Sequence, residues 1–287
     1  MKTEQQLKNK ISLFIDSGAH TLLKLHTHNK KHEEQFTFFK TKEFWDYVDG
    51  YAEWIHKNIK VIDIYANVDV ILNAEASWEV YDYMRKTHGL NPMPVFHFGE
   101  DIKWLKKYMD CTDYIAVGGV ALGVSTRKYW ERDVGFADNV FTTICDSSGM
   151  PQYKIHGFAV TSFPVMKLYP WYSVDSTTWV QYSRNGVICV PRCKAGEYVH
   201  DDRPWILAVS DKSPKKSDKG KHISTLSPEA REVIINYLTL KGFTLEEVAE
   251  DYKKRDELNI IYFLDFEKTL PKWPWRFKRL NDKRTLI

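Results

Sequence analysis

The stretch Ser12-Leu13-Phe14-Ile15-Asp16-Ser17-Gly18-Ala19 decides the fold, because a short apolar run ends there in an acidic residue and a glycine. Five later apolar runs end in a similar way, in an acid, a histidine or a glycine pair. They are residues 61–65 before Asn67 and Asp69, residues 94–96 before His97, residues 114–117 before Gly118 and Gly119, residues 154–155 before His156 and Gly157, and residues 172–174 before Asp175. Each run is too short for a helix and is typical of a strand.

The stretches between these runs predict helices. Residues 42–57, 74–88 and 101–109 carry apolar side chains at helical spacing. Strands that alternate with helices pair in parallel, so the fold class is α/β. We expect a TIM-like (β/α)8 barrel, regular or irregular, in which the carboxyl ends of the strands share one mouth. Asp16 and Asp175 are then expected to face each other.

The C-terminal third follows a different pattern. Residues 186–191 and 205–210 predict a hairpin or two further strands, which leaves closure of the barrel open. Residues 211–222 are polar and predict a surface loop. Helices are expected to begin at Ser227-Pro228 and at the capping box of Thr244, and residues 260–264 predict a last strand. We therefore assign residues 1–210 to a catalytic barrel domain and 211–287 to a basic loop and C-terminal extension that completes or flanks the barrel.

Composition sets the outer limits on function. A chain of 287 residues with 43% hydrophobic residues can bury one large core. A formal charge of +3 is too small to establish a polyanionic partner, so binding surfaces must be sought locally. The sequence has no candidate membrane span and no apolar signal-peptide core, which predicts a soluble cytoplasmic protein with free cysteines.

Four motifs carry a resemblance to a known family. Asp16-Ser17-Gly18-Ala19 resembles the Asp-Ser-Gly-Gly motif of the tRNA-guanine transglycosylases, and Gly118-Gly119 resembles their guanine-pocket glycines. His156-Gly157-Phe158, followed by Tyr172-Ser173-Val174-Asp175, is similar to their last catalytic strand pair. The motifs stand in the family's order over about residues 11 to 180, and their longer forms are most like the phage branch. Members of that branch exchange guanine in DNA for a 7-deazaguanine.

The resemblance implies a role for each strand end. Exchange of a base breaks an N-glycosidic bond through an oxocarbenium-like state that a carboxylate can trap. Asp175 is the implied nucleophile and Asp16 the implied general acid and base. The implied substrate pocket uses Asp69 as acceptor, with Asn67 sharing or replacing it, and backbone donors at the glycine pair; His97 stands where relatives often carry a glutamine. That glycine pair is Gly118 and Gly119, and the other implied pocket residues are Ser17, Gly18, His156 and Gly157.

Each of these residues has a structural alternative. An aspartate after a strand can be a helix N-cap or a loop hydrogen-bond acceptor, and this applies to Asp16, Asp69 and Asp175. A histidine in a barrel can be an ordinary buried residue, which applies to His97 and His156. The glycine pair can be only a tight turn.

Nucleic-acid contacts are expected from cations, because the target base must leave its stack while the backbone is held. The candidates are Arg127, Lys128 and Arg132, the loop residues Lys215, Lys216 and Lys219, and the tail residues Arg276 and Lys278. The alternative is a solubilising loop and a packed tail. Cys189, Cys193 and His200 are one ligand short of a structural zinc site, so no cofactor is expected.

Three functions stay open from the sequence. The leading one is exchange of guanine in DNA, with a 7-deazaguanine such as the cyano or aminomethyl form as incoming base, in the host cytoplasm if the chain is viral. The second is the same reaction on tRNA, and the third is a barrel that binds nucleic acid without catalysis. A hydrolase that leaves an abasic site needs nearly the same residues. A homodimer is left open.

Overall fold

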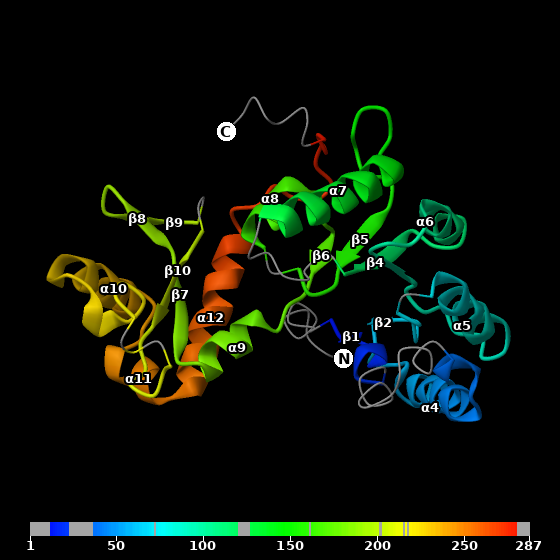
Figure 1. The fold of residues 1–287 in the computed structure, drawn as a ribbon, viewed down its shortest axis with the longest axis horizontal. Helices are drawn as coiled ribbons and strands as arrows, with labels where there is room; N and C mark the ends of the chain where they lie inside the picture. The colour runs from blue at the N-terminus through cyan, green and yellow to red at the C-terminus, as the bar shows by residue number, and fades with distance from the viewer. Residues whose placement is uncertain are drawn as a thin grey trace, which may run out of the picture. The chain divides into compact units, whose positions relative to one another are not determined.

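A computed structural model shows a mixed α/β protein (Figure 1). The structure describes residues 12–22, 37–71, 73–119, 127–160, 162–200, 203–214, 216 and 218–279, and of residues 127–134 the backbone alone. They divide into two compact units. The first unit holds the described residues up to Phe158, Trp171–Ser173 and those from Arg276 on, and the second holds Ala159–Pro170 and Val174–Trp275. The predicted domain boundary at residue 210 stays a prediction.

Six short strands alternate with helices, as the sequence predicts. They are β1 (Phe14–Ile15), β2 (Ile64–Tyr65), β3 (Val95–His97), β4 (Tyr114–Gly118), β5 (Lys154–Gly157) and β6 (Ser173–Val174). β1 pairs in parallel with β2, and β3, β4, β5 and β6 form a sheet in that order. A parallel bridge from Ala66 to Met93 links the end of β2 to the segment that enters β3. Spatial order therefore follows chain order.

The two hydrogen-bonded sheets that hold β1 to β6 are joined by this bridge, and side chains of β1 meet those of β5. The ring of Phe14 on β1 lies 4.7 Å from the ring of His156 on β5 and 5.8 Å from that of Phe158. Phe14 also packs against a buried cluster of Met93, Val95 and Ala116. Because β1 and β5 are not neighbours in the strand order, the sheet must curl to bring their side chains together.

Helices follow the strands and cover them with apolar stripes. The first unit includes α4 (Lys42–Asn58), α5 (Ala74–Lys86), α6 (Ile102–Met109) and α7 (Arg127–Ile144), with a short 3₁₀ helix, η1 (Phe38–Lys40), before α4. Thr41, Asn73 and Asp101 cap α4, α5 and α6 with side-chain oxygens. The three helices predicted from spacing are thus confirmed.

The second unit combines an antiparallel pair with a helical cluster. Its elements are α8 (Phe163–Leu168), α9 (Thr178–Arg184), β7 (Val187–Val190), β8 (Arg192–Lys194), β9 (Glu197–Val199), β10 (Trp205–Ala208), η2 (Ile223–Thr225), α10 (Pro228–Leu240), α11 (Leu245–Glu250) and α12 (Tyr252–Glu267). β7 pairs with β10 antiparallel, and β8 and β9 form a hairpin between them. Ser227 caps α10, and Thr244 with Glu247 forms the predicted capping box of α11.

The predicted strand at residues 260–264 is wrong, because these residues lie inside α12. The five apolar residues favour a strand when they are read alone. Asp251 caps a helix that begins earlier, and the buried side chains Leu258, Tyr262 and Phe266 recur every four residues through the run. Helical burial over sixteen residues outweighs the local strand preference.

Within the described residues, no helix combines the length and the apolar character that a membrane span requires.

Candidate functional site

Asp16 lies at the carboxyl end of β1, in a turn that requires glycine. Backbone N–H groups of Ser17 and Gly18 hydrogen-bond its carboxylate. Gly18 has a φ of +73°, and a Cβ there would lie 2.9 Å from the hydroxyl of Tyr47, which itself donates to the Ser17 carbonyl at 2.6 Å. The tight turn therefore fixes the carboxyl group of Asp16 at the strand end.

The surroundings of Asp16 favour its protonated form. Although the residue has solvent contact, the protein atoms packed around its carboxyl raise the pKa of Asp16, and the negative charge of Asp69 raises it further. Burial and the negative charge of Asp16 likewise raise the pKa of Tyr47. A carboxyl group with a raised pKa is suited to donate a proton.

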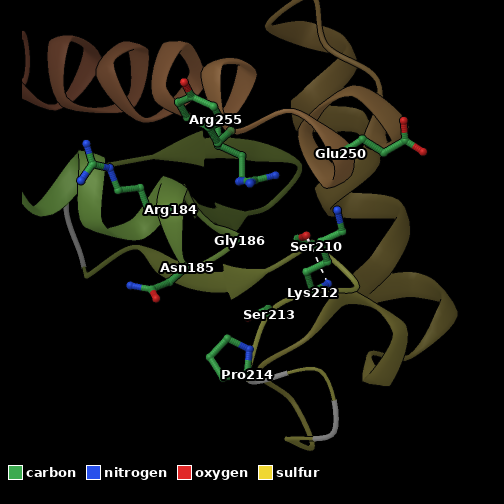
Figure 2. Close-up of a pocket in the computed structure, with 10 residues that line it drawn as sticks. Arg184, Asn185, Gly186, Ser210, Lys212, Ser213, Pro214, Glu250 and Arg255 are labelled. Atoms are coloured by element: carbon green, nitrogen blue, oxygen red, sulfur yellow. Dashed lines mark hydrogen bonds between the residues drawn. The ribbon is translucent and has the colours of Figure 1, made fainter.

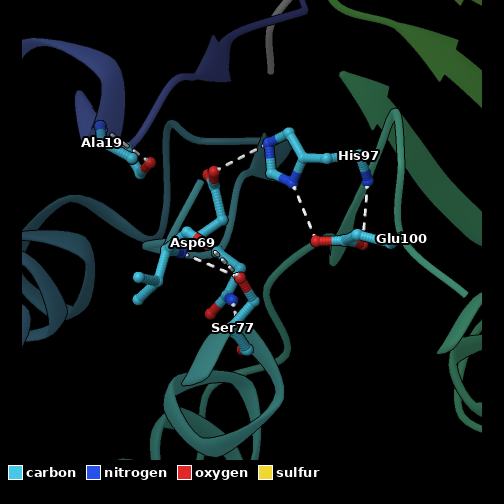
Figure 3. Close-up of polar contacts among 8 residues, drawn as sticks. Ala19, Asp69, Ser77, His97 and Glu100 are labelled. Atoms are coloured by element: carbon cyan, nitrogen blue, oxygen red, sulfur yellow. Dashed lines mark hydrogen bonds and ion pairs between the residues drawn. The ribbon is translucent and has the colours of Figure 1, made fainter. Parts of the chain in front are cut away.

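Asp69, His97 and Glu100 form a buried row of alternating charge (Figure 3). His97 Nε2 lies 3.0 Å from Asp69 Oδ2, and Nδ1 lies 3.5 Å from Glu100 Oε1. The backbone N–H of His97 donates to Glu100 Oε2 at 2.9 Å. All three side chains are 9% exposed or less.

The carboxylates on both sides hold His97 in its charged form. Burial lowers the pKa of His97, but Asp69 and Glu100 outweigh burial and raise it to about 10. At neutral pH His97 is therefore an imidazolium between Asp69 and Glu100. Asp69 is not the N-cap of α5, because Asn73 occupies that position.

The glycine pair Gly118 and Gly119 makes room for the β3 end. Gly118 is the Cα partner of His97 in the β3–β4 ladder, and a Cβ on Gly118 would lie 2.7 Å from His97 Cδ2. Gly119 has a φ of +79°, and a Cβ there would approach the Cβ of Phe98 to 3.0 Å. Both glycines thus have a packing reason, and the predicted donation from their backbone to a base stays a prediction.

Asn67 supports the loop that carries Asp69. Its Nδ2 donates to the Ser77 carbonyl at 3.0 Å, and the Ser77 hydroxyl in turn bonds both backbone groups of Val70. Asn67 Oδ1 is buried without a hydrogen-bond partner among the described residues. Asn67 is therefore a positioning residue with one buried acceptor left over.

His156 differs from His97 in its charge state. Its Nδ1 lies 2.7 Å from the hydroxyl of Ser173, which lies 2.6 Å from the hydroxyl of Tyr114. Burial lowers the pKa of His156 to about 4, so the ring is neutral at physiological pH. Gly157 is the Cα partner of Val117 in the β4–β5 ladder. The neutral ring and its bond to the Ser173 hydroxyl fit an interior histidine that bonds within the fold.

Asp175 belongs to the second unit and is exposed. Its Oδ1 accepts the N–H of Ala159 at 2.7 Å, and Ala159 holds a left-handed φ of +54°. The N-cap of α9 is Thr177, so Asp175 does not serve as that cap. Because Asp16 lies in the first unit, the expected meeting of the two carboxyl groups stays a prediction.

The predicted nucleic-acid contacts fall into three groups. Arg127, Lys128 and Arg132 lie on α7, and their side chains are outside the described part, as is Lys215. Lys216 is paired with Asp211 at 3.1 Å, whereas Lys219 is exposed.

The tail is both packed and basic. Phe277 is buried, and its N–H donates to the Gly149 carbonyl at 2.8 Å. Arg276, Lys278 and Arg279, with Asp146 as the acidic member, line a cavity of about 520 Å³ beside it. The packed-tail alternative therefore does not exclude a cationic surface there.

The weak zinc candidates lie in different surroundings. Cys189 is buried in β7, where burial raises the pKa of its thiol to about 12, and Cys193 is exposed on β8. The ring of His200 lies 5.0 Å from that of Tyr262. Among the described residues, no group of three or more His, Cys, Asp or Glu side chains is placed to hold a metal ion.

Glu100 is the site residue that the sequence analysis missed. The available signal was its position three residues after His97, just before the cap of α6.

Comparisons with family models, curated proteins and solved structures found no match. Functional inference therefore depends on the residues and their geometry.

Proposed function

We propose that this protein is a transglycosylase that exchanges guanine in DNA for a 7-deazaguanine base through a covalent aspartyl–sugar intermediate. The observation that carries the proposal is the solvent-exposed Asp16 at the end of β1: the protein atoms packed around its carboxyl and the charge of Asp69 raise its pKa, while Asp69 is ion-paired with a buried His97. Two neighbouring carboxyls with different partners are the arrangement that separates an acid from an acceptor.

Asp16 is the proton carrier in this scheme. It protonates the leaving guanine as the glycosidic bond breaks, and it later takes the N9 proton of the incoming 7-deazaguanine. Asp69 Oδ1 accepts hydrogen bonds from the N1–H and the amino group of the base, because Oδ2 is held by His97. His97 and Glu100 are positioning residues that keep Asp69 in place.

Asp175 is the nucleophile. One carboxylate oxygen attacks C1′ as guanine departs, which gives a glycosyl ester; N9 of the deprotonated incoming base then attacks C1′ and releases the carboxylate. The Ala159 N–H at 2.7 Å from Oδ1 supports this role, since it orients the carboxylate at the surface of the second unit. Water must be excluded while the ester exists, or hydrolysis replaces exchange.

A barrel scaffold is part of the proposal. Six strands in chain order and the contact of Phe14 on β1 with His156 on β5 support a TIM-like closure. In such a scaffold the ends of all strands open into one mouth, and the candidate residues lie at those ends.

The test is base exchange followed by nucleoside mass spectrometry. Purified protein is incubated with labelled cyano- or aminomethyl-deazaguanine and either duplex DNA or tRNA. We expect label in DNA, a loss of about 10²–10⁴-fold for Asp16→Asn and a larger loss for Asp175→Asn. Asp110→Asn, an exposed aspartate after α6, is the matched control and should retain activity.

Other outcomes assign a different function. Label in tRNA alone identifies the tRNA reaction, and release of guanine without incorporation identifies a hydrolase. Tight binding to nucleic acid with neither reaction overturns the enzymatic proposal in favour of a binding barrel.

A further inference from the structure

A basic cavity of about 530 Å³ lies in the second unit and is lined by residues to which no role is assigned above, although the loop that carries Lys216 follows its lining in the chain (Figure 2). Its wall is formed by the end of α9, the turns after β10, and the α11–α12 junction. Three cations, Arg184, Lys212 and Arg255, line it against one carboxylate, Glu250. We propose that this cavity binds a phosphate of a nucleic-acid backbone.

Arg255 is a buried residue of the cavity wall whose side chain is held by hydrogen bonds. It is 5% exposed, its Nε donates to the Ser183 carbonyl at 2.7 Å, and its Nη1 donates to the carbonyls of Val248 at 2.6 Å and Ala249 at 3.1 Å. These carbonyls fix the plane of the guanidinium without neutralising it. Nη2 bonds no described residue, and Figure 2 shows the side chain reaching from α12 toward Gly186 and Ser210.

Arg184 and Lys212 add two exposed cations that form no ion pair with a described residue. The neighbouring loop lysines differ, since Lys216 is paired with Asp211 at 3.1 Å and Lys221 with Asp218 at 3.3 Å. Asp251 and Asp256 act electrostatically on Arg255, so the positive charge without an ion-pair partner at the cavity is that of Arg184 and Lys212. Like charges held together in this way favour an anionic ligand.

The backbone around Lys212 is tightly fixed. The Lys212 N–H donates to Ser210 Oγ at 3.3 Å, which leaves the hydroxyl proton of Ser210 available to a ligand. Gly186 has a φ of +72°, and a Cβ there would lie 2.6 Å from the Cβ of Ser210. A side chain at position 186 would therefore collide with Ser210, which also lines the cavity.

The chemistry of the lining favours a phosphodiester. A planar guanidinium and an ammonium are the usual partners of phosphate oxygens. Tyr252 also lines the cavity and is 50% exposed, which offers a face on which a neighbouring base can stack. A cationic pocket beside an exposed ring fits a nucleic-acid strand better than a free phosphate ion.

The inference rests on the proposed function only for the kind of partner, so its test involves no turnover. Binding of fluorescein-labelled single-stranded and duplex DNA is measured by anisotropy over a salt series, without any deazaguanine. The variant is Arg184→Gln with Lys212→Gln, whose side chains are exposed. Arg231→Gln with Lys272→Gln removes the same charge from exposed positions outside the cavity and serves as control.

We expect the cavity variant to bind about ten-fold more weakly than the control pair. The slope of log affinity against log salt should fall by about 0.7 on single strands, the amount for one lost phosphate contact. A third variant, Arg255→Lys, keeps the positive charge but loses the planar guanidinium with its several N–H donors, so it should also weaken binding. Circular dichroism checks that this variant folds.

The outcomes separate this inference from the proposed function. Equal affinity and slope for the cavity and control pairs overturn the inference even if base exchange is observed. Weakened binding supports it even if no exchange is observed. Binding of inorganic phosphate or a mononucleotide at the cavity, with unchanged DNA affinity, overturns it in favour of a small-molecule site.

Discussion

The charge on buried His97 should make the stability of the protein fall at alkaline pH. Its pKa is raised from the ordinary 6.5 to about 10, because Asp69 and Glu100 outweigh the effect of burial. A raised histidine pKa stabilises the folded state fully below about pH 6.5, where both states are protonated. This stabilisation is lost as pH rises toward 10, because the folded state alone still binds the proton.

The size of the effect follows from the same numbers. The rise from 6.5 to about 10 corresponds to about 5 kcal/mol at most, or about 1.4 kcal/mol for each pH unit between them. Removing the imidazole leaves the side chains of Asp69 and Glu100, on its two sides, buried without the cation between them. His97→Gln should therefore lower the free energy of unfolding by about 3–5 kcal/mol near pH 6, and that free energy should no longer fall with rising pH between 6.5 and about 10.

Urea unfolding followed by tryptophan fluorescence at pH 6, 7.5 and 9 measures both quantities. His56→Gln, at an exposed position of α4, is the matched control and should keep the wild-type slope. Gly118→Ala should behave like His97→Gln in slope, since its Cβ would displace the ring from Asp69. Parallel pH curves for wild type and His97→Gln would refute the reasoning.

Three further predictions concern packing and reactivity. Gly186→Ala should destabilise the protein by about 1–3 kcal/mol in thermal unfolding, because of its positive φ and the contact with Ser210, whereas Gly50→Ala, in open space on α4, should be neutral or stabilising. Asn259→Leu should cost about 3 kcal/mol in urea unfolding, since its buried amide accepts from the Cys189 N–H at 2.8 Å and donates to Ser183 and Val187; a loss under 1 kcal/mol would contradict this. Iodoacetamide should label exposed Cys193 long before buried Cys189, whose pKa is about 12, and equal rates by mass spectrometry would falsify that ordering.

Local chemistry made much of the fold predictable. Strand positions followed from apolar runs that end in a polar residue, and helix starts followed from caps such as Ser227 and Thr244. Both signals act within a few residues, so the sequence contains them in full. The prediction of a strand at residues 260–264 is wrong because the signal that begins their helix, the cap at Asp251, lies outside this run of five residues.

The sequence alone determined which polar side chains stand at strand ends, because that follows from the order of residues along each strand. Only the tertiary structure decided their charge. His97 and His156 both follow apolar runs, yet His97 meets two carboxylates and His156 meets the hydroxyl of Ser173, which in turn bonds that of Tyr114. The tertiary structure likewise brought Arg184, Lys212 and Arg255 to one cavity. Burial and through-space charge depend on neighbours that are distant in the chain, so no local pattern can report them.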